Sequence, residues 1–89
     1  MRFAVICRDK PGCLQTRLDT RAAHLAYIEQ TGIVEMAGPL IEAGQMCGSL
    51  IVLACASLDD AQAWAANDPY AGAGLFDSVT ITEWKKVIG

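Results

Sequence analysis

The single histidine of the chain, His24, is the side chain best suited to exchange a proton near neutral pH. It follows Arg17 and Arg21 at helical spacing, so the three side chains are expected to lie side by side on one helix. Two arginines beside the ring would also attract an anionic ligand. A half-exposed histidine among solvated arginines has the same pattern and is the commoner arrangement in proteins. His24 is therefore a candidate general acid or base, with the surface histidine as the alternative.

Asp68 is the second residue whose side chain could take part in chemistry. It continues the apolar helical stripe of Ala61, Trp64 and Ala65, where a carboxylate needs a partner or a role. The tripeptide Asn67-Asp68-Pro69 is also typical of a helix end followed by a turn. From spacing alone, the turn is the preferred interpretation.

Weaker signals surround these two residues. Tyr70 and the small residues at 71–74 predict a loop whose backbone could approach a ligand closely, but they lack the GxGxxG pattern of phosphate-binding loops. Ser49 lies at the start of an expected strand without the GxSxG elbow of serine hydrolases, which disfavours that class.

The four cysteines match neither the CxxC redox spacing nor a zinc ribbon. Cys47 and Cys55 fall on one expected strand, too far apart to share a metal. Cys7 is expected to be a small buried hydrophobe, which leaves Cys13, in a loop, as the one exposed thiol. We expect structural thiols, and neither a metal nor a cofactor.

The elements that position these residues begin with an apolar strand over 2–8, which the turn residues at 9–12 end. A helix is expected over 17–31, capped by Thr16 with Asp19 and stopped by Gly32. The next strand, 33–41, is interrupted at Gly38-Pro39, and the proline there places it at a sheet edge or a bulge.

The second half of the chain predicts another strand, helix and strand. Residues 48–56 are apolar on both alternating faces, which predicts a central strand covered on each side. Ser57 with Asp60 opens a short helix that ends at Asp68-Pro69. Residues 77–87 alternate between apolar and polar side chains and predict a partly exposed strand.

The resulting order, β-α-β-β-α-β, predicts an α+β ferredoxin-like fold with a four-stranded antiparallel sheet and two helices on one face. The strands at 2–8 and 48–56 are apolar on both sides, so the uncovered face would expose a large apolar patch. A second copy of the chain is expected to cover it, which predicts a homodimer.

Composition limits the classes of function. The 89 residues suffice for one domain, residues 1–89, and 53% of them are hydrophobic. The net charge of -3 and the lack of a basic run disfavour nucleic acid as a partner, and an RNA-binding sheet would need more aromatic residues on its central strands. No stretch is long enough to span a membrane or to serve as a secretion signal, so a cytoplasmic location is expected.

The assembled motifs resemble the YciI-like (YCII-related) family. The resemblance rests on Arg21-Ala22-Ala23-His24-Leu25, Ala37-Gly38-Pro39-Leu40, Gly48-Ser49, the segment 57–64, Asp68-Pro69-Tyr70 and Lys85-Lys86-Val87. It implies a dimeric α+β barrel and an active site built on a histidine and an aspartate, which are His24 and Asp68 here. One relative of the family is a dehydrochlorinase of a chlorinated hydroxyhydroquinone.

These observations lead to one hypothesis and one alternative. We expect a small cofactor-independent enzyme, lyase-like or hydrolase-like, that performs acid-base chemistry on a small cyclic or phenolic metabolite. Catalysis would fall to His24 and Asp68, and substrate binding to Arg21, Gly38, Pro39, Ser49 and Tyr70. The alternative is a non-catalytic dimeric module that binds a small molecule or another protein, because ferredoxin-like folds host many functions.

Overall fold

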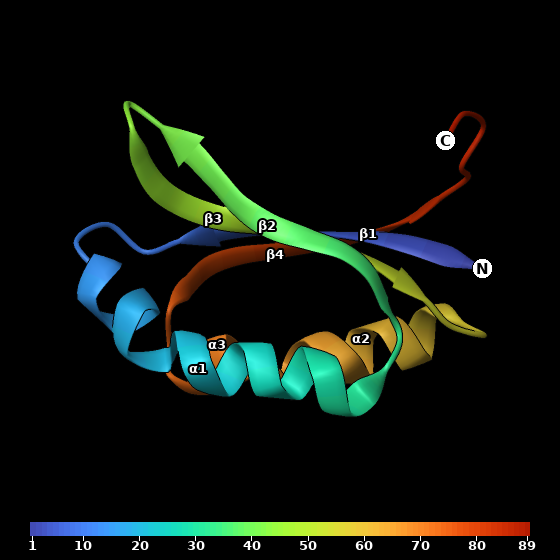
Figure 1. Ribbon diagram of the computed structural model, residues 1–89, viewed down its shortest axis with the longest axis horizontal. Helices are drawn as coiled ribbons and strands as arrows, with labels where there is room; N and C mark the ends of the chain where they lie inside the picture. The colour runs from blue at the N-terminus through green and yellow to red at the C-terminus, as the bar shows by residue number, and fades with distance from the viewer.

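A four-stranded antiparallel sheet carries all the helices on one face (Figure 1). The computed structural model describes residues 1–89, and the strands lie side by side in the order β2-β3-β1-β4. The elements are β1 (Arg2–Asp9), α1 (Leu14–Thr31), β2 (Val34–Glu42), β3 (Gln45–Ala54), α2 (Leu58–Ala66), α3 (Pro69–Gly72) and β4 (Phe76–Trp84). The expected α+β ferredoxin-like fold is confirmed, with one additional short helix.

The core lies between the sheet and the helices. Strand β1 alternates, so that Phe3, Val5 and Cys7 point toward the helices and are buried. They meet Ile51 and Leu53 of β3, and Ala61 and Trp64 of α2 complete the cluster. The two central strands, β1 and β3, therefore supply the sheet side of the core.

Helix α1 begins three residues before its expected start. Cys13 is the N-cap and its side chain forms no capping hydrogen bond, so the predicted capping box of Thr16 and Asp19 is wrong. Asp19 instead accepts a hydrogen bond of 2.8 Å from the Gln15 side chain one turn earlier. The predicted stop is correct, because Gly32 adopts a left-handed conformation with a φ of 65°.

The β2–β3 hairpin is longer than predicted. Strand β2 is an edge strand, as expected, but Gly38-Pro39 does not interrupt it. Strand β3 starts at residue 45 instead of 48, because Ala43 and Gly44, with φ of 50° and 75°, form a tight turn. Strand β3 also ends two residues early, so that Cys55 lies after the strand and not in it.

The segment after α2 differs most from the sequence prediction. Ser57 caps α2 as predicted, and its hydroxyl accepts a hydrogen bond from the Asp60 backbone at 3.2 Å. Residues 69–72, however, form the one-turn helix α3 where a loop was expected. Asp68 is its N-cap, which a proline at the next position favours. The chain then enters β4 at residue 76 and leaves it at residue 84, three residues before the expected end.

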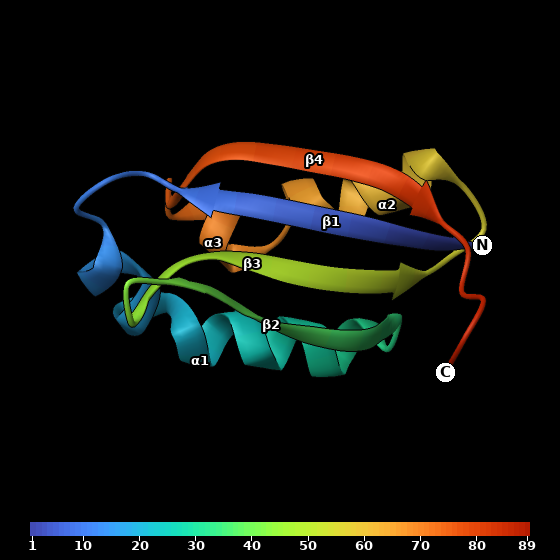
Figure 2. The ribbon, with the colours of Figure 1, turned by 90° about the horizontal axis from the view of Figure 1, so that it is seen from above.

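The opposite face of the sheet carries no helix (Figure 2). Strand pairing places Ile6, Leu50, Met36 and Trp84 on this face, and all four are exposed. The residues after β4 also leave the sheet on the side away from the helices (Figure 1). No helix is long and apolar enough to cross a membrane.

Candidate active site

His24 and Asp68, which are 44 residues apart in the sequence, form a buried pair. His24 Nδ1 lies 2.8 Å from Asp68 Oδ1, and the two residues are 6% and 2% exposed. The backbone N–H of Tyr70 donates to the same carboxylate oxygen at 3.0 Å, which fixes the carboxylate at the start of α3. The alternative of a half-exposed surface histidine is therefore wrong, and Asp68, which lies at the expected turn, is buried and paired.

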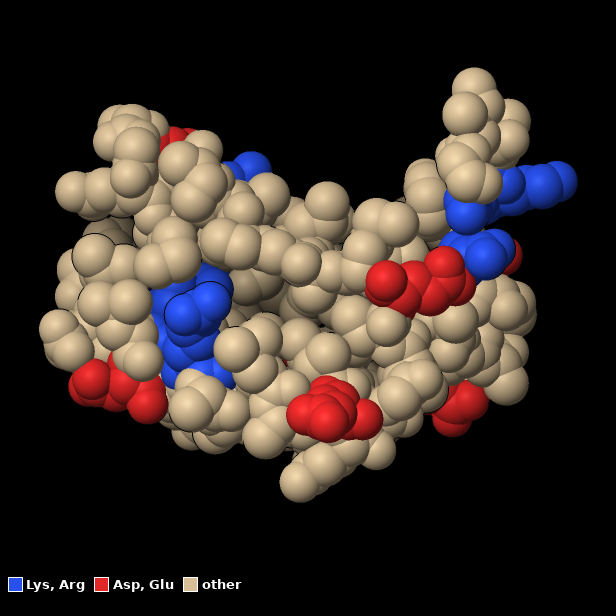
Figure 3. Space-filling view, viewed as in Figure 1, with Lys and Arg blue, Asp and Glu red and all other residues tan.

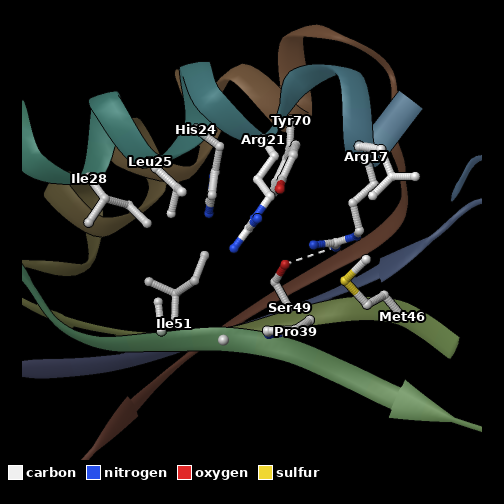
Figure 4. Close-up of a pocket in the computed structure, with 13 residues that line it drawn as sticks. Arg17, Arg21, His24, Leu25, Ile28, Pro39, Met46, Ser49, Ile51 and Tyr70 are labelled. Carbon is white, nitrogen blue, oxygen red and sulfur yellow. Dashed lines mark hydrogen bonds between the residues drawn. The ribbon is translucent and has the colours of Figure 1, made fainter. Parts of the chain in front are cut away.

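The pairing determines which histidine nitrogen is available. A carboxylate accepts hydrogen bonds, so Nδ1 carries the hydrogen that is donated to Asp68. In the neutral ring Nε2 is then an acceptor. Figure 4 shows a ring nitrogen of His24 pointing into the cavity, away from the helix. The site therefore holds an imidazole ring with a defined orientation and an acceptor nitrogen toward the cavity.

Tyr70 supports the ring from one side. The aromatic rings of Tyr70 and His24 stack with centroids 4.0 Å apart and planes inclined by 18°. Burial raises the pKa of Tyr70, and Asp68 raises it further, although Arg17 and Arg21 act in the opposite direction. Tyr70 therefore stays a neutral phenol that can donate a hydrogen bond.

Arg17 is not a solvated arginine, as its sequence context suggested, but a buried structural cation. Its guanidinium donates to both carboxylate oxygens of Asp9, at 2.7 and 2.8 Å, and to Ser49 Oγ at 2.9 Å. It also lies 4.7 Å from the centre of the Tyr70 ring. Burial alone would lower the pKa of Arg17, but the hydrogen bonds and charge of Asp9, with Tyr70, raise it on balance. The positive charge of Arg17 is therefore balanced within the protein by Asp9.

The His24 ring faces a cavity of about 390 Å³ between α1 and the β2–β3 part of the sheet. This volume suits a small ligand. Basic side chains, blue in Figure 3, gather in a hollow on this face between α1 and β2. The cavity brings together all the predicted binding residues with an apolar wall that was not predicted. Its lining is Arg17, Leu18, Arg21, His24, Leu25, Ile28, Ala37, Gly38, Pro39, Met46, Ser49, Ile51 and Tyr70.

Two residues of the site escaped sequence reasoning. Asp9, the partner of Arg17, was assigned to a turn because it precedes Lys10-Pro11-Gly12. Met46 precedes the expected start of β3 at residue 48, and an irregular register near Leu40 places it against the cavity. An acidic residue at a strand end is the one signal that could have pointed to Asp9, since the helical arginines needed a partner.

The cysteines lie outside this cavity. Burial, helped by Asp68, raises the pKa of the Cys7 thiol from 9.0 to about 12. Cys13 and Cys47 line a second cavity of about 350 Å³ near the hairpin end. The prediction that Cys13 is the only exposed thiol is wrong, because Cys47 and Cys55 are also partly exposed. No group of three potential metal ligands is present.

Known proteins are similar to this chain in sequence and fold. The family model of the YCII-related domain matches residues 1–85. Protein YciI of Escherichia coli is 34% identical over an alignment of 100 positions, which covers 98% of this chain and 99% of that protein.

Two solved structures extend the comparison. The 5-chloro-2-hydroxyhydroquinone dehydrochlorinase of Burkholderia phenoliruptrix, in complex with 2,5-dihydroxybenzoquinone, has a TM-score of 0.89 and 37% identity, over 96% of this chain and 94% of that one. An antibiotic biosynthesis monooxygenase has a TM-score of 0.61 and 8% identity over 98% of both chains, and shares the fold alone.

Proposed function

The chain belongs to the family of YCII-related domains, and we propose that it is a small-molecule enzyme in which His24 transfers a proton to or from the substrate. One observation carries this proposal: the buried His24 lines a cavity with its ring held by Asp68 at 2.8 Å. A histidine that only stabilised the fold would not need a ring nitrogen in an accessible cavity.

The reaction that fits this pair best is an elimination started by proton removal. His24 Nε2 takes a proton from the substrate, and the leaving group departs with the electrons of its bond to carbon. The ring is then an imidazolium, which the Asp68 carboxylate stabilises through Nδ1–H. With a chlorinated substrate the products are the dehydrochlorinated molecule, chloride and one proton held by His24.

The substrate class follows from the cavity and from the relative. The cavity of about 390 Å³ has an apolar wall that includes Leu25, Ile28 and Ile51, which suits a small cyclic or phenolic compound. The similar dehydrochlorinase acts on 5-chloro-2-hydroxyhydroquinone and shares 37% of its residues with this chain. That compound is therefore the first substrate to test.

The same proposal includes a homodimer. The exposed apolar side chains on the bare face of the sheet support it, since that face needs a cover that this chain does not provide.

The proposal predicts that the purified protein releases chloride from 5-chloro-2-hydroxyhydroquinone, measured with a chloride electrode under anaerobic conditions. His24→Gln should reduce the rate by at least about 100-fold, because general acid-base catalysis contributes roughly that much or more. Asp68→Asn should reduce it less, because the base remains. Glu29→Gln, on the same helix and outside the cavity lining, is the matched control and should keep the wild-type rate.

A second measurement separates the role of Asp68 from a loss of folding. Ring ¹⁵N chemical shifts of the neutral His24 should show hydrogen on Nδ1 in the wild type and a mixture of tautomers in Asp68→Asn. If the protein turned over neither this compound nor any of a panel of phenols, lactones and chlorinated rings, the proposed enzymatic function would be contradicted. Binding without turnover would instead support the small-molecule-binding module.

A further inference from the structure

The charges that line the cavity are not balanced. Arg17 is paired with Asp9, and His24 with Asp68, so both are satisfied within the protein. Arg21 lines the same cavity, is exposed, and takes part in none of the ion pairs of the chain. No aspartate or glutamate is among the lining residues. The cavity therefore presents one cation without a counter-charge.

Two hydroxyl groups add to this excess of donors. Ser49 Oγ accepts from Arg17 and donates to no group of the chain, although the residue is 3% exposed. Tyr70 is equally buried, and Arg17 and Arg21 beside its hydroxyl cannot accept a hydrogen bond. The nearby Asp68 carboxylate contacts His24 and the Tyr70 backbone instead, and the Tyr70 hydroxyl donates to no group of the chain. Both hydroxyl hydrogens are therefore free for a ligand in the cavity.

Only one lining side chain has the opposite requirement. With its hydrogen on Nδ1, His24 presents Nε2 as a nitrogen that must accept. The polar groups thus form an asymmetric pattern: Arg21, Tyr70 and Ser49 donate, and His24 accepts. A ligand that satisfies all of them carries oxygen acceptors toward the donors and one acidic hydrogen toward His24.

The shape of the cavity favours a planar ligand. Leu25 and Ile28 of α1 lie on one side of the cavity and Ile51 of β3 lies across from them, as Figure 4 shows. Two facing apolar walls leave a space that suits a flat ring, with its polar edge toward the donors. We propose that the cavity selects a planar, singly charged oxyanion, bound at its oxygen edge by Arg21, Tyr70 and Ser49.

This inference rests on the proposed function for its site, but it concerns binding and not turnover. It assigns the ligand the chemistry of a hydroxyquinone anion, an enolate or an aromatic carboxylate. Arg21 supplies the charge preference, because a hydrogen bond between two ionised groups is stronger than one between neutral groups. The raised pKa of Tyr70 supports its role as a donor, since the group keeps its hydrogen at neutral pH.

Benzoate and benzamide test the charge preference, because they are planar and of nearly equal size but differ in charge. ¹⁵N-labelled protein is titrated with each compound, and the backbone signals of Ser49 and Tyr70 report occupancy of the cavity. We expect benzoate to bind at least about tenfold more tightly than benzamide, as a charge-assisted contact predicts.

Variants assign the preference to its source. Arg21→Met should reduce benzoate binding to the level of benzamide, whereas Arg21→Lys should retain part of the preference. Lys85→Met removes the same charge from an exposed position outside the cavity lining and should change nothing. Tyr70→Phe, which keeps the ring that stacks on His24, and Ser49→Ala should each reduce the affinity for benzoate several-fold.

Equal binding of the two compounds, signal changes outside the cavity, or an unchanged preference in Arg21→Met would overturn the inference. Failure here is distinguishable from failure of the enzyme. His24→Gln is expected to lose chloride release and to keep the preference for benzoate. Chloride release without any preference would leave the proposed reaction standing and remove only the anionic ligand.

Discussion

Asp68 uses one carboxylate oxygen for two hydrogen bonds. Oδ1 accepts from the Tyr70 backbone and faces His24 Nδ1, at 3.0 and 2.8 Å. The first bond caps α3, and the second orients the histidine. Because Tyr70 also stacks on the His24 ring, the turn after Asp68 fixes the ring from two directions. The position of the His24 ring therefore depends on a helix of one turn.

Cys7 provides a test of how burial affects stability. Its pKa of about 12 lies above the ordinary 9.0, so folding favours the protonated thiol. The contribution to stability is complete below pH 9 and is lost as the pH rises toward 12. We expect the free energy of unfolding in urea to fall between about pH 8 and about pH 10.5, and to fall less in Cys7→Val.

Comparing the two proteins removes the other alkaline groups. Tyr27 and Tyr70 also have raised pKa values, so they act in the same direction, but they are present in both proteins. Parallel decreases in the wild type and Cys7→Val would contradict the assignment to Cys7. Activity below pH 9 should be the same in both, because Cys7 does not line the cavity.

The sequence predicted the chemical groups of the site better than their environment. His24 stood out because it is the only histidine, and the family resemblance then directed attention to Asp68. The burial of Arg17 was missed, since its partner Asp9 lies on another element and local spacing carries no record of that contact. Asp68-Pro69 is also a typical N-cap followed by a first-turn proline, a signal of α3 that the turn interpretation overlooked.

The Asp9–Arg17 pair connects three elements at the end of the cavity. Asp9 ends β1, Arg17 belongs to the second turn of α1, and Ser49 lies on β3. The side chains of Arg17 and Asp9 are 4% and 7% exposed. The adjacent Gly48 also serves this junction, because a Cβ there would clash with the carbonyl oxygen of Cys7. The pair therefore aligns the first half of α1 with the sheet.

We expect Arg17→Met to lower the free energy of unfolding by about 3 to 5 kcal/mol, because it leaves the Asp9 carboxylate buried without a partner. Arg2→Met is the matched control. It breaks the exposed pair of Arg2 with Glu35 and should cost no more than about 1 kcal/mol. Urea unfolding at one protein concentration measures both. Equal losses in the two variants would show that Asp9 and Arg17 are not held out of water.

The elements themselves were predictable wherever the pattern is local. The apolar runs of β1 and β3, the Gly32 stop and the Ser57 cap appear in the structure as expected. Element starts were less predictable. α1 extends to Leu14 without a capping side chain, and β3 gains residues through the turn at Ala43-Gly44, which contains no strong strand formers. Tertiary contacts and hairpin geometry decide such starts.

The molecule has two faces of different character. The helical face holds the cavity, and the bare face of the sheet exposes Ile6, Leu50, Met36 and Trp84. Val87 and Ile88, which follow β4, are almost fully exposed. Clustered exposed side chains of this type mark association surfaces in soluble proteins. A two-fold pair of sheets would cover the face of each partner with the same residues.

The proposed homodimer predicts a particle of twice the 9.5 kDa chain mass in sedimentation equilibrium at micromolar concentration. Leu50→Asp places a charge on β3, at the centre of the bare face, and should give a monomer. Leu58→Asp is the control, because Leu58 begins α2 on the other side of the sheet and is as exposed as Leu50, at 43% against 40%. It should remain dimeric. A monomeric wild type, or dissociation by both variants alike, would contradict a dimer formed through the sheet, and the apolar face would then need another partner.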